Sequence, residues 1–402
     1  MPPGWKLWIM RAARGAVTAT SETGGKIMKI WKAWAHLAAI LLVILCGLAR
    51  TPSADAALKP GVAALLKKRI AAAMELPRFM PPGAPFNPAP LKGKLIFTIP
   101  VSTAIPFCDV VDRQMAEFAS RAGLRFEIWE NNAQLAQWVQ GFTAGLDHKA
   151  SLINVFCGLD PATVAPQIRE ARAAGVPVVA AHTYAPGQPQ LKDLSAIVYG
   201  AYLPAAKLEA DWIISDTKGN ADVLVITSPS TANSPYIQKE IAGEFAKYCP
   251  RCKLRFIGVN APDWPTKIGP QVQSAIIGDP KLNYVLPIYD GMAQFVVPAI
   301  IATGASGRVK VASFNATPAV LDMIRTGNIV TFDVGEDTTW LAGAIIDQDM
   351  RLLLRKKLVP GYEAGLRAFT KKNVAAAGVP AKFGVGYGAS AEQGYAKLWG
   401  LH

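Results

Sequence analysis

The chain has 402 residues, of which 51% are apolar and 18% charged, with 34 glycines and 30 prolines. This length accommodates two domains, or three small ones, and the apolar content is sufficient for packed cores. The composition excludes a disordered, collagen-like or coiled-coil chain.

The formal charge of +13 is unevenly distributed along the chain. Residues 1–56 hold seven basic and two acidic residues, which leaves 35 basic and 27 acidic residues, an excess of +8, in residues 57–402. There the Lys and Arg residues are scattered along predicted amphipathic helices, and no basic run is interleaved with aromatic residues. We therefore expect a solvated charged surface and no nucleic-acid partner.

The N-terminus has the three parts of a secretory signal peptide. Lys29 and Lys32 precede the apolar run 37–48, and an Ala-Asp-Ala triplet at 54–56 follows it. A basic segment, an apolar run of about a dozen residues and an A-x-A site are typical of such a signal. Residues 1–56 are therefore predicted to be a signal peptide, cleaved after Ala56, that directs the protein to the periplasm.

Two alternatives concern the same segment. Met28 could open an ordinary signal peptide by itself, so residues 1–27 are either a mis-assigned start or an extension. The apolar run could also anchor the chain, although it is shorter than the roughly 20 residues of a membrane-spanning helix. No later apolar stretch reaches about 18 residues, so we expect the mature protein to be soluble and exported.

Residues 57–90 are predicted to hold a short amphipathic helix, 62–74, followed by a proline-rich strap, 77–90. We expect this leader to pack on the main body or to tether it. From Lys94 onward short apolar runs rich in β-branched residues alternate with segments of helical periodicity, such as 110–122 and 161–174. The predicted strands are 95–101, 124–129, 152–156, 176–181, 196–199, 223–227, 254–259, 284–288, 309–314 and 329–332.

Near-continuous apolar strands joined by helices predict parallel sheets that are covered on both faces. Ten strands are too many for one compact sheet, so we expect two similar doubly wound α/β lobes. Ligands of open α/β sheets bind beyond the carboxyl ends of the strands. The residues that follow each strand are therefore the candidates for a binding site.

The first strand is followed by Ser102, Thr103, Phe107 and Cys108, with a helix expected near Asp109. This stretch suits a polar, uncharged or weakly anionic ligand, or it is only a turn that Asp109 caps. Later strand ends carry a mixture of aromatic and hydrogen-bonding residues: Cys157, Gly158, Asp160, His182, Thr183, Tyr184, the segment from Ser228 to Ser234, Asp263, Trp264, Tyr289, Asp290, Phe314, Asn315 and Thr317. Stacking faces with sparse hydrogen-bonding groups are typical of a site for a small ring-shaped ligand.

Three segments share the residue pattern of one protein family. The first strand and its turn read LIFTIPVSTAIPFCDVV, a later helix and strand read IREARAAGVPVVA, and residues 314–318 read Phe-Asn-Ala-Thr-Pro. From Lys94 to about Val374 the chain resembles the type I periplasmic solute-binding proteins of sugar ABC transporters, the ribose- and galactose-binding group. In that family the third segment is an aromatic residue followed by Asp-Gly-Thr-Pro.

The resemblance implies two lobes joined by a three-crossing hinge, with the ligand in the cleft between them. The implied N-terminal lobe is 91–201 plus 335–360, the C-terminal lobe is 202–334 plus 361–380, and 381–402 form a C-terminal tail. The implied function is that of an exported monomeric protein that captures a small neutral ligand, a sugar or polyol, and delivers it to an ABC permease at the inner membrane.

The resemblance also implies roles for individual residues. Phe107 and Cys108 take the place of the stacking aromatics of the first lobe, with Ser102 or Thr103 beside them. Trp264 falls where the second lobe contributes its own aromatic. Asn315 lies where the family has an aspartate, Tyr289 where it often has an asparagine, and Asp333 falls at the second hinge.

The chain departs from the family at two places whose residues, in the family, bind the hydroxyl groups of the sugar. His182 and Thr183 stand where ribose binders have an Asp-Arg pair, and residues 238–240 contain no arginine. Arginine forks and carboxylates hold ring hydroxyls, so an aromatic or less hydroxylated solute is the alternative ligand. A protein that presents its ligand to a sensory receptor is a third hypothesis.

Four cysteines follow the predicted cleavage site. Cys249 and Cys252 lie between a helix and a strand, which favours a small structural disulfide over free thiols or a redox or metal site. Cys108 and Cys157 follow the first and third strands, which are neighbours in a doubly wound sheet, so they could pair or could line the cleft.

An enzyme is not expected. The histidines after residue 57 are His148, His182 and His402, and the sequence has neither a Gly-x-Ser-x-Gly nor a His-Glu-x-x-His motif. Gly384 to Gly388 resemble a nucleotide loop but lack the strand, helix and distal acid that would support one. We therefore expect no catalytic residues, no cofactor and no metal.

Overall fold

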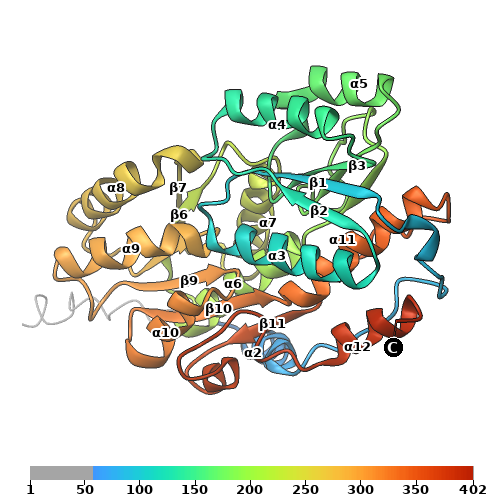
Figure 1. Ribbon diagram of the computed structural model, residues 1–402. Coiled ribbons are helices and arrows are strands. Elements are labelled where there is room, and N and C mark those ends of the chain that lie inside the picture. Colours follow the sequence, from blue (N-terminus) through green and yellow to red (C-terminus); the bar gives the residue numbers. More distant parts are fainter. Residues whose placement is uncertain (1–57, 402) are drawn as a thin grey trace, which may run out of the picture. The chain divides into compact units, whose positions relative to one another are not determined.

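The computed structural model describes residues 58–401 (Figure 1). The predicted signal peptide, residues 1–56, and His402 lie outside the described residues. Residues 58–401 form two sheets, each covered by helices on both faces. The predicted pair of doubly wound lobes is therefore confirmed.

The N-terminal lobe is built on a five-stranded parallel sheet of order β2-β1-β3-β4-β5. Its strands are β1 (Leu95–Pro100), β2 (Arg125–Ile128), β3 (Leu152–Phe156), β4 (Val178–Ala181) and β5 (Ala196–Val198). Its helices are α3 (Pro106–Arg121), α4 (Leu135–Asp147), α5 (Ala165–Ala173), α11 (Thr338–Leu353) and α12 (Ser390–Leu398), with short turns η1 (Ala89–Leu91) and η2 (Pro161–Val164). All residues of β1 and β3 are buried, because α4 and α5 cover one face and α3 and α11 the other (Figure 1).

The C-terminal lobe has a six-stranded sheet of order β11-β10-β9-β8-β6-β7. Its strands are β6 (Asp222–Thr227), β7 (Lys253–Gly258), β8 (Tyr284–Pro287), β9 (Lys310–Phe314), β10 (Val330–Glu336) and β11 (Leu366–Phe369). Its helices are α2 (Pro60–Met74), α6 (Tyr202–Asp216), α7 (Ser234–Tyr248), α8 (Trp264–Gly278), α9 (Asp290–Ala302) and α10 (Pro318–Thr326), with turns η3 (Ala261–Asp263) and η4 (Val374–Ala377).

Strand β11 was not expected from the sequence. It pairs antiparallel with β10, whereas the other pairings of this sheet are parallel. At four residues, two of them only half-buried, β11 is too short to show the continuous apolar run of a central strand.

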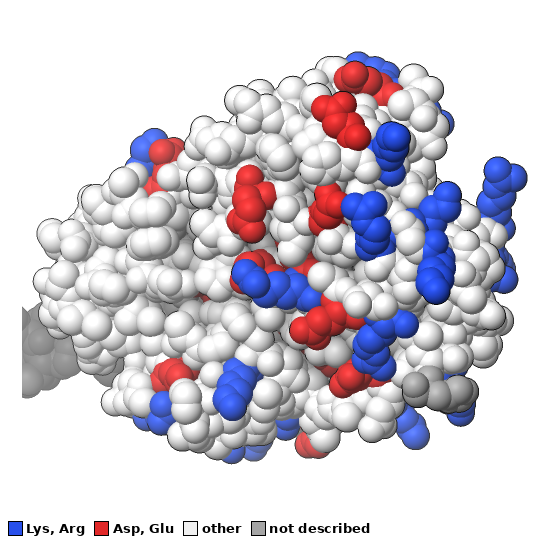
Figure 2. Space-filling model, viewed as in Figure 1, with Lys and Arg blue, Asp and Glu red and all other residues white. Residues whose placement is uncertain are grey.

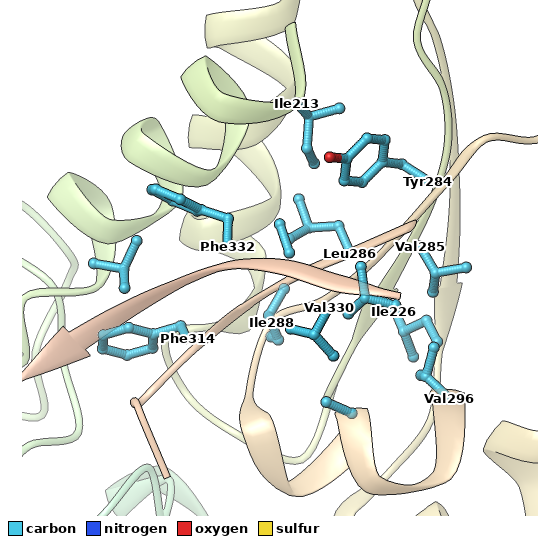
Figure 3. Packing of buried hydrophobic residues seen from close by; sticks show 14 of the residues in the cluster. Ile213, Ile226, Tyr284, Val285, Leu286, Ile288, Val296, Phe314, Val330 and Phe332 are labelled. Atoms are coloured by element: carbon cyan, nitrogen blue, oxygen red, sulfur yellow. The ribbon is translucent and has the colours of Figure 1, made fainter. Parts of the chain in front are cut away.

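Large apolar side chains from both faces of the second sheet form its core (Figure 3). Tyr284, Leu286 and Phe332 contribute side chains that are completely buried. The ring of Phe332 stacks on Trp212 of α6 with centroids 4.8 Å apart and planes 8° apart. Burial of a side chain of this size stabilises the fold by about 2–3 kcal/mol, so the sheet is a rigid support for the loops at its strand ends.

The chain passes between the lobes after β5, after β10 and between α11 and β11, which are the three predicted crossings. Two further connections come from the terminal segments. Helix α2 packs on α6 of the C-terminal lobe. The strap after it reaches the N-terminal lobe, where the centroid of the Phe79 ring lies 5.0 Å from those of Trp340 and Tyr395. The predicted C-terminal tail folds into α12, because Tyr395 and Trp399 bury their rings against α3 and α11.

Basic and acidic residues are interspersed on the face that Figure 2 shows. Arg69 of α2 forms ion pairs with the buried Asp211, at 3.0 Å, and with Glu244, at 2.7 Å. Within residues 58–401 no helix is long and apolar enough to cross a membrane.

Asp349 of α11 predicts a pH-dependent stability. Burial raises the pKa of this carboxyl group to about 8, although Asn154 donates a 2.7 Å hydrogen bond to it. In the unfolded chain the pKa is about 4, so the folded state binds more protons between these values. The free energy of unfolding should therefore fall as pH rises, by on the order of 1 kcal/mol per pH unit between pH 5 and pH 7.

Urea unfolding of wild type and Asp349→Asn at pH 5, 6 and 7 measures this contribution. The variant keeps a neutral group of the same shape, so its stability should depend less steeply on pH. Equal slopes for the two proteins would show that Asp349 is ionised in the folded state across this range.

Candidate functional site

The carboxyl ends of the strands of both sheets carry an unusual backbone conformation. Cys157, His182 and Asn315 each directly follow a strand, and their φ angles are 60°, 47° and 126°. Ala316 also has a positive φ, of 50°. Positive φ is sterically costly for residues other than glycine and persists where surrounding contacts hold it, often at binding sites. These residues therefore mark one location where the two lobes face each other.

A cavity of about 30 Å³ lies at this location. Its lining comes from both lobes: Val101, Ile105, Phe107, Cys108, Cys157 and His182 from the first, and Tyr202, Thr231, Trp264, Tyr289 and Asn315 from the hinge helix α6 and the second. None of these lining residues is a Lys, Arg, Asp or Glu. The cavity therefore has aromatic walls with a few directional polar groups.

His182 is the centre of a buried polar network. Its Nε2 lies 2.7 Å from Glu336 Oε2, and its Nδ1 lies 2.9 Å from the Tyr202 hydroxyl. Glu336 Oε1 accepts a hydrogen bond from the backbone N–H of Ala201 at 3.2 Å. Ala201 precedes α6 and Glu336 ends β10, so this network joins two hinge crossings to the end of β4. Burial raises the pKa of the Tyr202 phenol well above its usual range, which keeps it neutral.

Aromatic rings extend from the first lobe to the second in a continuous series. The Phe107 ring lies 5.3 Å from the His182 ring, which lies 4.7 Å from Tyr202. Tyr202 is 6.4 Å from Tyr289, which is 6.3 Å from Trp264. These centroid separations are typical of interacting rings, so the rings support one another on both sides of the cavity.

Hydrogen bonds fix the aromatic side chains of the second lobe. Trp264 Nε1 donates to the Val259 carbonyl at 3.0 Å, and the Tyr289 hydroxyl donates to Asn233 Oδ1 at 2.5 Å. The Tyr289 hydroxyl also lies 3.4 Å from Thr231 Oγ1. Trp264 packs so closely over Gly291 that a Cβ there would lie 3.0 Å from its ring. The ring faces are therefore the parts of these side chains that a ligand can use.

A disulfide bond joins Cys108 to Cys157 in the cavity wall. It ties the first turn of α3, which carries Phe107, to the residue that follows β3. The sequence left open whether these cysteines pair or line the cleft, and in the structure they do both. Cys249 and Cys252 form a second disulfide, away from the cavity.

Two buried carboxyl groups hold the loop that carries Asn315. Asp333 Oδ1 accepts a hydrogen bond from Ala316 N at 3.1 Å, and Asp290 Oδ2 accepts one from Thr317 N at 2.6 Å. Burial raises the pKa of Asp290 to about 6, and burial together with Asp290 raises that of Asp333 well above its usual range. The two carboxyl groups therefore stabilise the backbone of residues 315–317 without lining the cavity themselves.

A second opening of about 290 Å³ adjoins the small cavity and shares Ile105 and Trp264 with it. Ser102 lines this outer cleft, opposite Gly291 and Phe295 of α9. The outer cleft and the small cavity are therefore neighbours at the inter-lobe site.

Six of the ten predicted site residues line the small cavity of about 30 Å³, hereafter the inner cavity: Phe107, Cys108, His182, Trp264, Tyr289 and Asn315. The other four point elsewhere. Ser102 and Thr103 hydrogen-bond to the Asn131 carbonyl, and Thr183 donates to the Ala181 carbonyl. Asp333 lies inside β10, which extends to Glu336 and thus beyond the predicted end at residue 332.

Sequence reasoning missed Tyr202 and Glu336, whereas Thr231 lies within the strand-end segment 228–234 that was expected to contribute. Tyr202 begins α6 immediately after the first crossing. Its position beyond a strand end is the signal that could have identified it. Glu336 takes the hinge position that was expected for Asp333, because β10 is longer than its apolar run. Within residues 58–401 no cluster of His, Cys, Asp and Glu is arranged to hold a metal ion.

Comparisons with known proteins agree with this geometry. A family model described as a periplasmic binding protein domain matches residues 96–357. The D-ribose/D-allose-binding protein of Pseudomonas aeruginosa is 25% identical over 179 residues, which are 44% of this chain and 55% of that protein. The chain thus spans about half the length of this curated relative.

Solved structures of transport proteins share the fold. An ABC sugar transporter subunit from Rhodobacter sphaeroides 2.4.1 superposes with a TM-score of 0.62 at 15% identity. The match covers 70% of this chain and 100% of that subunit. A solute-binding protein from Agrobacterium vitis with bound allitol has a TM-score of 0.62 at 19% identity, covering 71% and 97%. The 5-methylthioribose-binding protein of Thermotoga lettingae TMO has the same score and identity, covering 77% and 94%. These likenesses confirm the predicted type I fold.

Proposed function

Since the chain belongs to the periplasmic binding protein family, we propose that it captures a small neutral solute, a sugar or polyol, between its two lobes. The family resemblance expected from the sequence is thereby confirmed. The observation that carries the proposal is the inner cavity, where aromatic rings from both lobes face each other among a few polar groups. Aromatic faces with sparse hydrogen-bonding groups suit small ring-shaped or polyhydroxylated ligands.

Capture requires the lobes to move. In the present conformation they touch, because Ala232 N donates to the Gly158 carbonyl at 3.3 Å and Gln188 Nε2 donates to the Ala232 carbonyl at 2.6 Å. The remaining 30 Å³ corresponds to roughly one water molecule. A ligand therefore enters an opened cleft, and it favours closure only to the extent that it binds the closed form better than the open one.

In the closed complex the site residues have distinct roles. Phe107 and Trp264 flank the ligand from opposite lobes, the rings of Tyr289 and His182 add further faces, and Asn315 supplies hydrogen bonds. Ser102 lies at the mouth of the cleft. The disulfide between Cys108 and Cys157 keeps Phe107 in place while the lobes move.

The names of the relatives support a sugar or polyol as the ligand class, since they are described with D-ribose, D-allose or allitol. We further propose that the signal peptide exports the chain to the periplasm, and that the protein acts there as a monomer delivering its ligand to an ABC permease.

A second candidate ligand is an aromatic or less hydroxylated solute. The cavity offers neither an arginine fork nor a carboxylate to ring hydroxyls, because its described lining includes no Arg, Asp or Glu. His182 already has Glu336 and Tyr202 as partners. The structural relative described with 5-methylthioribose, a sugar with one thioether in place of a hydroxyl, shares the fold.

A thermal-shift screen of the purified chain separates these ligand classes. A ligand at about 100 times its Kd adds roughly 2.7 kcal/mol to the free energy of unfolding. We expect sugars or polyols to raise Tm and aromatic acids to leave it unchanged. A rise with aromatic acids alone would favour the second candidate, and no rise with any compound would count against both.

Trp264→Ala should weaken binding of the ligand identified by this screen about 100-fold, because the variant loses the stacking face of the second lobe. This loss corresponds to about 2.7 kcal/mol and lies within the range for buried aromatic anchors. Isothermal titration calorimetry measures it, and Trp264→Phe should recover most of the affinity.

Trp212→Ala is the matched control, since Trp212 packs in the same lobe but does not line the site. It should lower stability with little effect on ligand affinity. If Trp264→Ala bound the ligand as tightly as wild type, the assignment of this site would be wrong.

A further inference from the structure

A cavity of about 490 Å³ lies at the opposite end of the C-terminal lobe from the inter-lobe site. Lys310, which begins β9, and Val330, which begins β10, line it. Asn315 and Glu336, at the other ends of the same two strands, belong to the inter-lobe site and its network. The two cavities are therefore separated by the length of the sheet.

Segments outside the family match build the walls of this cavity. Helix α2 forms one wall and residues 370–372, after β11, form another, whereas the family model covers residues 96–357. The two segments lie together beside α10 in Figure 1, and α2 contacts β11. The cavity thus lies between the matched binding-protein domain and segments outside it.

Apolar side chains form the floor of the cavity. Ile70 and Met74 of α2, Ile324 of α10 and Val330 line it. Trp212 is held by its stack on Phe332 and by Nε1, which donates to Thr331 Oγ1 at 3.1 Å. The floor is therefore preformed, and the volume falls within the usual range of about 300–1,000 Å³ for small-molecule sites.

Lysines surround the floor. Four of them line the cavity: Lys67, Lys310, Lys371 and Lys372. The single carboxylate of the lining, Asp216, lies 2.8 Å from Lys310 and neutralises it. Lys371 donates to Asn328 Oδ1 at 2.9 Å, and within residues 58–401 no carboxylate forms an ion pair with Lys67, Lys371 or Lys372. Three positive charges are left uncompensated at the rim.

We propose that this cavity is a second binding site, which takes a small amphiphilic anion with an apolar chain or ring and a carboxylate or phosphate head. The apolar floor receives the body of the ligand, and the rim lysines neutralise its head. A neutral sugar would leave both the lysines and the floor unused, and a basic peptide would be repelled. The site is independent of the inter-lobe site, so it does not depend on the proposed solute.

The test is calorimetric titration of the full chain with decanoate and with decyl phosphate, both below their micelle-forming concentrations. Decanol is the neutral comparison. We expect both anions to bind and decanol to bind at least tenfold more weakly. The two anionic probes distinguish a carboxylate from a phosphate as the preferred head.

Exposed lysines allow a matched pair of variants that leaves the core intact. The triple variant Lys67→Gln, Lys371→Gln and Lys372→Gln should bind the anions at least tenfold more weakly. Replacement of three exposed lysines elsewhere, Lys239, Lys281 and Lys397, by Gln removes the same net charge and should change the affinity less than twofold. Met74→Glu should abolish binding, whereas Met74→Leu should retain it.

Three results would overturn the proposal. The first is absence of binding by either anion, and the second is equal loss of affinity in the two triple variants. The third is that the protein cosediments with phosphatidylglycerol vesicles but does not bind the soluble anions, and that the triple variant of Lys67, Lys371 and Lys372 no longer cosediments. That result would assign the lysines to a membrane surface rather than to a small-molecule site.

Discussion

Replacing Cys108 and Cys157 together by Ala is expected to lower the free energy of unfolding by about 4 kcal/mol. The two cysteines are 49 residues apart in the sequence, and a cross-link over a loop of this length restricts the unfolded chain by about that amount. In the folded chain the bond ties the first turn of α3 to the end of β3. Urea unfolding under non-reducing conditions measures the loss.

The second disulfide of the chain provides a matched comparison. Cys249 and Cys252 are three residues apart. The same dependence on loop length predicts that their cross-link stabilises the fold by less than about 2 kcal/mol. The double variant Cys249→Ala and Cys252→Ala should therefore lose less than half as much stability. Equal losses from the two pairs would show that loop length does not control these contributions.

Glu336→Ala is expected to lower the free energy of unfolding by about 4 kcal/mol. The variant removes a fully buried carboxyl group and leaves His182 Nε2 and the Ala201 N–H without the partner they have at 2.7 and 3.2 Å. Each buried polar group that loses its partner costs about 1–3 kcal/mol. Ligand affinity should fall as well, because Glu336 joins two hinge crossings to His182 in the cavity wall.

Glu336→Gln is the conservative comparison. Its amide oxygen can still accept from Ala201 and its size is unchanged, so it should lose less than half of what the alanine variant loses. Chemical unfolding and ligand titration of the two variants test this expectation together. A Glu336→Ala variant as stable as wild type would show that the network does not support the hinge.

The sequence by itself determined the fold, because the pattern that specifies it is local. Apolar runs such as 95–101 and 152–156 correspond to β1 and β3, whose residues are all buried, and the helical stripe of 110–122 corresponds to α3. A buried strand must be apolar on both faces, so it is visible in the chain without knowledge of its partners. Strand β11, short and half-buried, lacks this pattern and was missed.

The location of the site at the strand ends could also be predicted, since parallel strands place their carboxyl ends at one edge. Phe107, Trp264 and Asn315 were identified in this way, and the cavity includes them.

Only the tertiary structure decided which side chains at these ends face the cavity. Thr183 follows His182 directly, yet His182 lines the cavity while Thr183 hydrogen-bonds to the Ala181 carbonyl. Ser102 and Thr103 are held by the Asn131 carbonyl of a neighbouring loop. In these loops a difference of one residue separates a lining residue from a structural one, and only the folded backbone decides which is which.

Contacts between distant segments likewise determine the partners of His182 and the walls of the 490 Å³ cavity. Glu336 lies 154 residues from His182, and α2 meets residues 370–372 some 300 positions further along the chain. Neither contact leaves a periodic signal in the sequence, because each joins side chains that lie far apart in the chain.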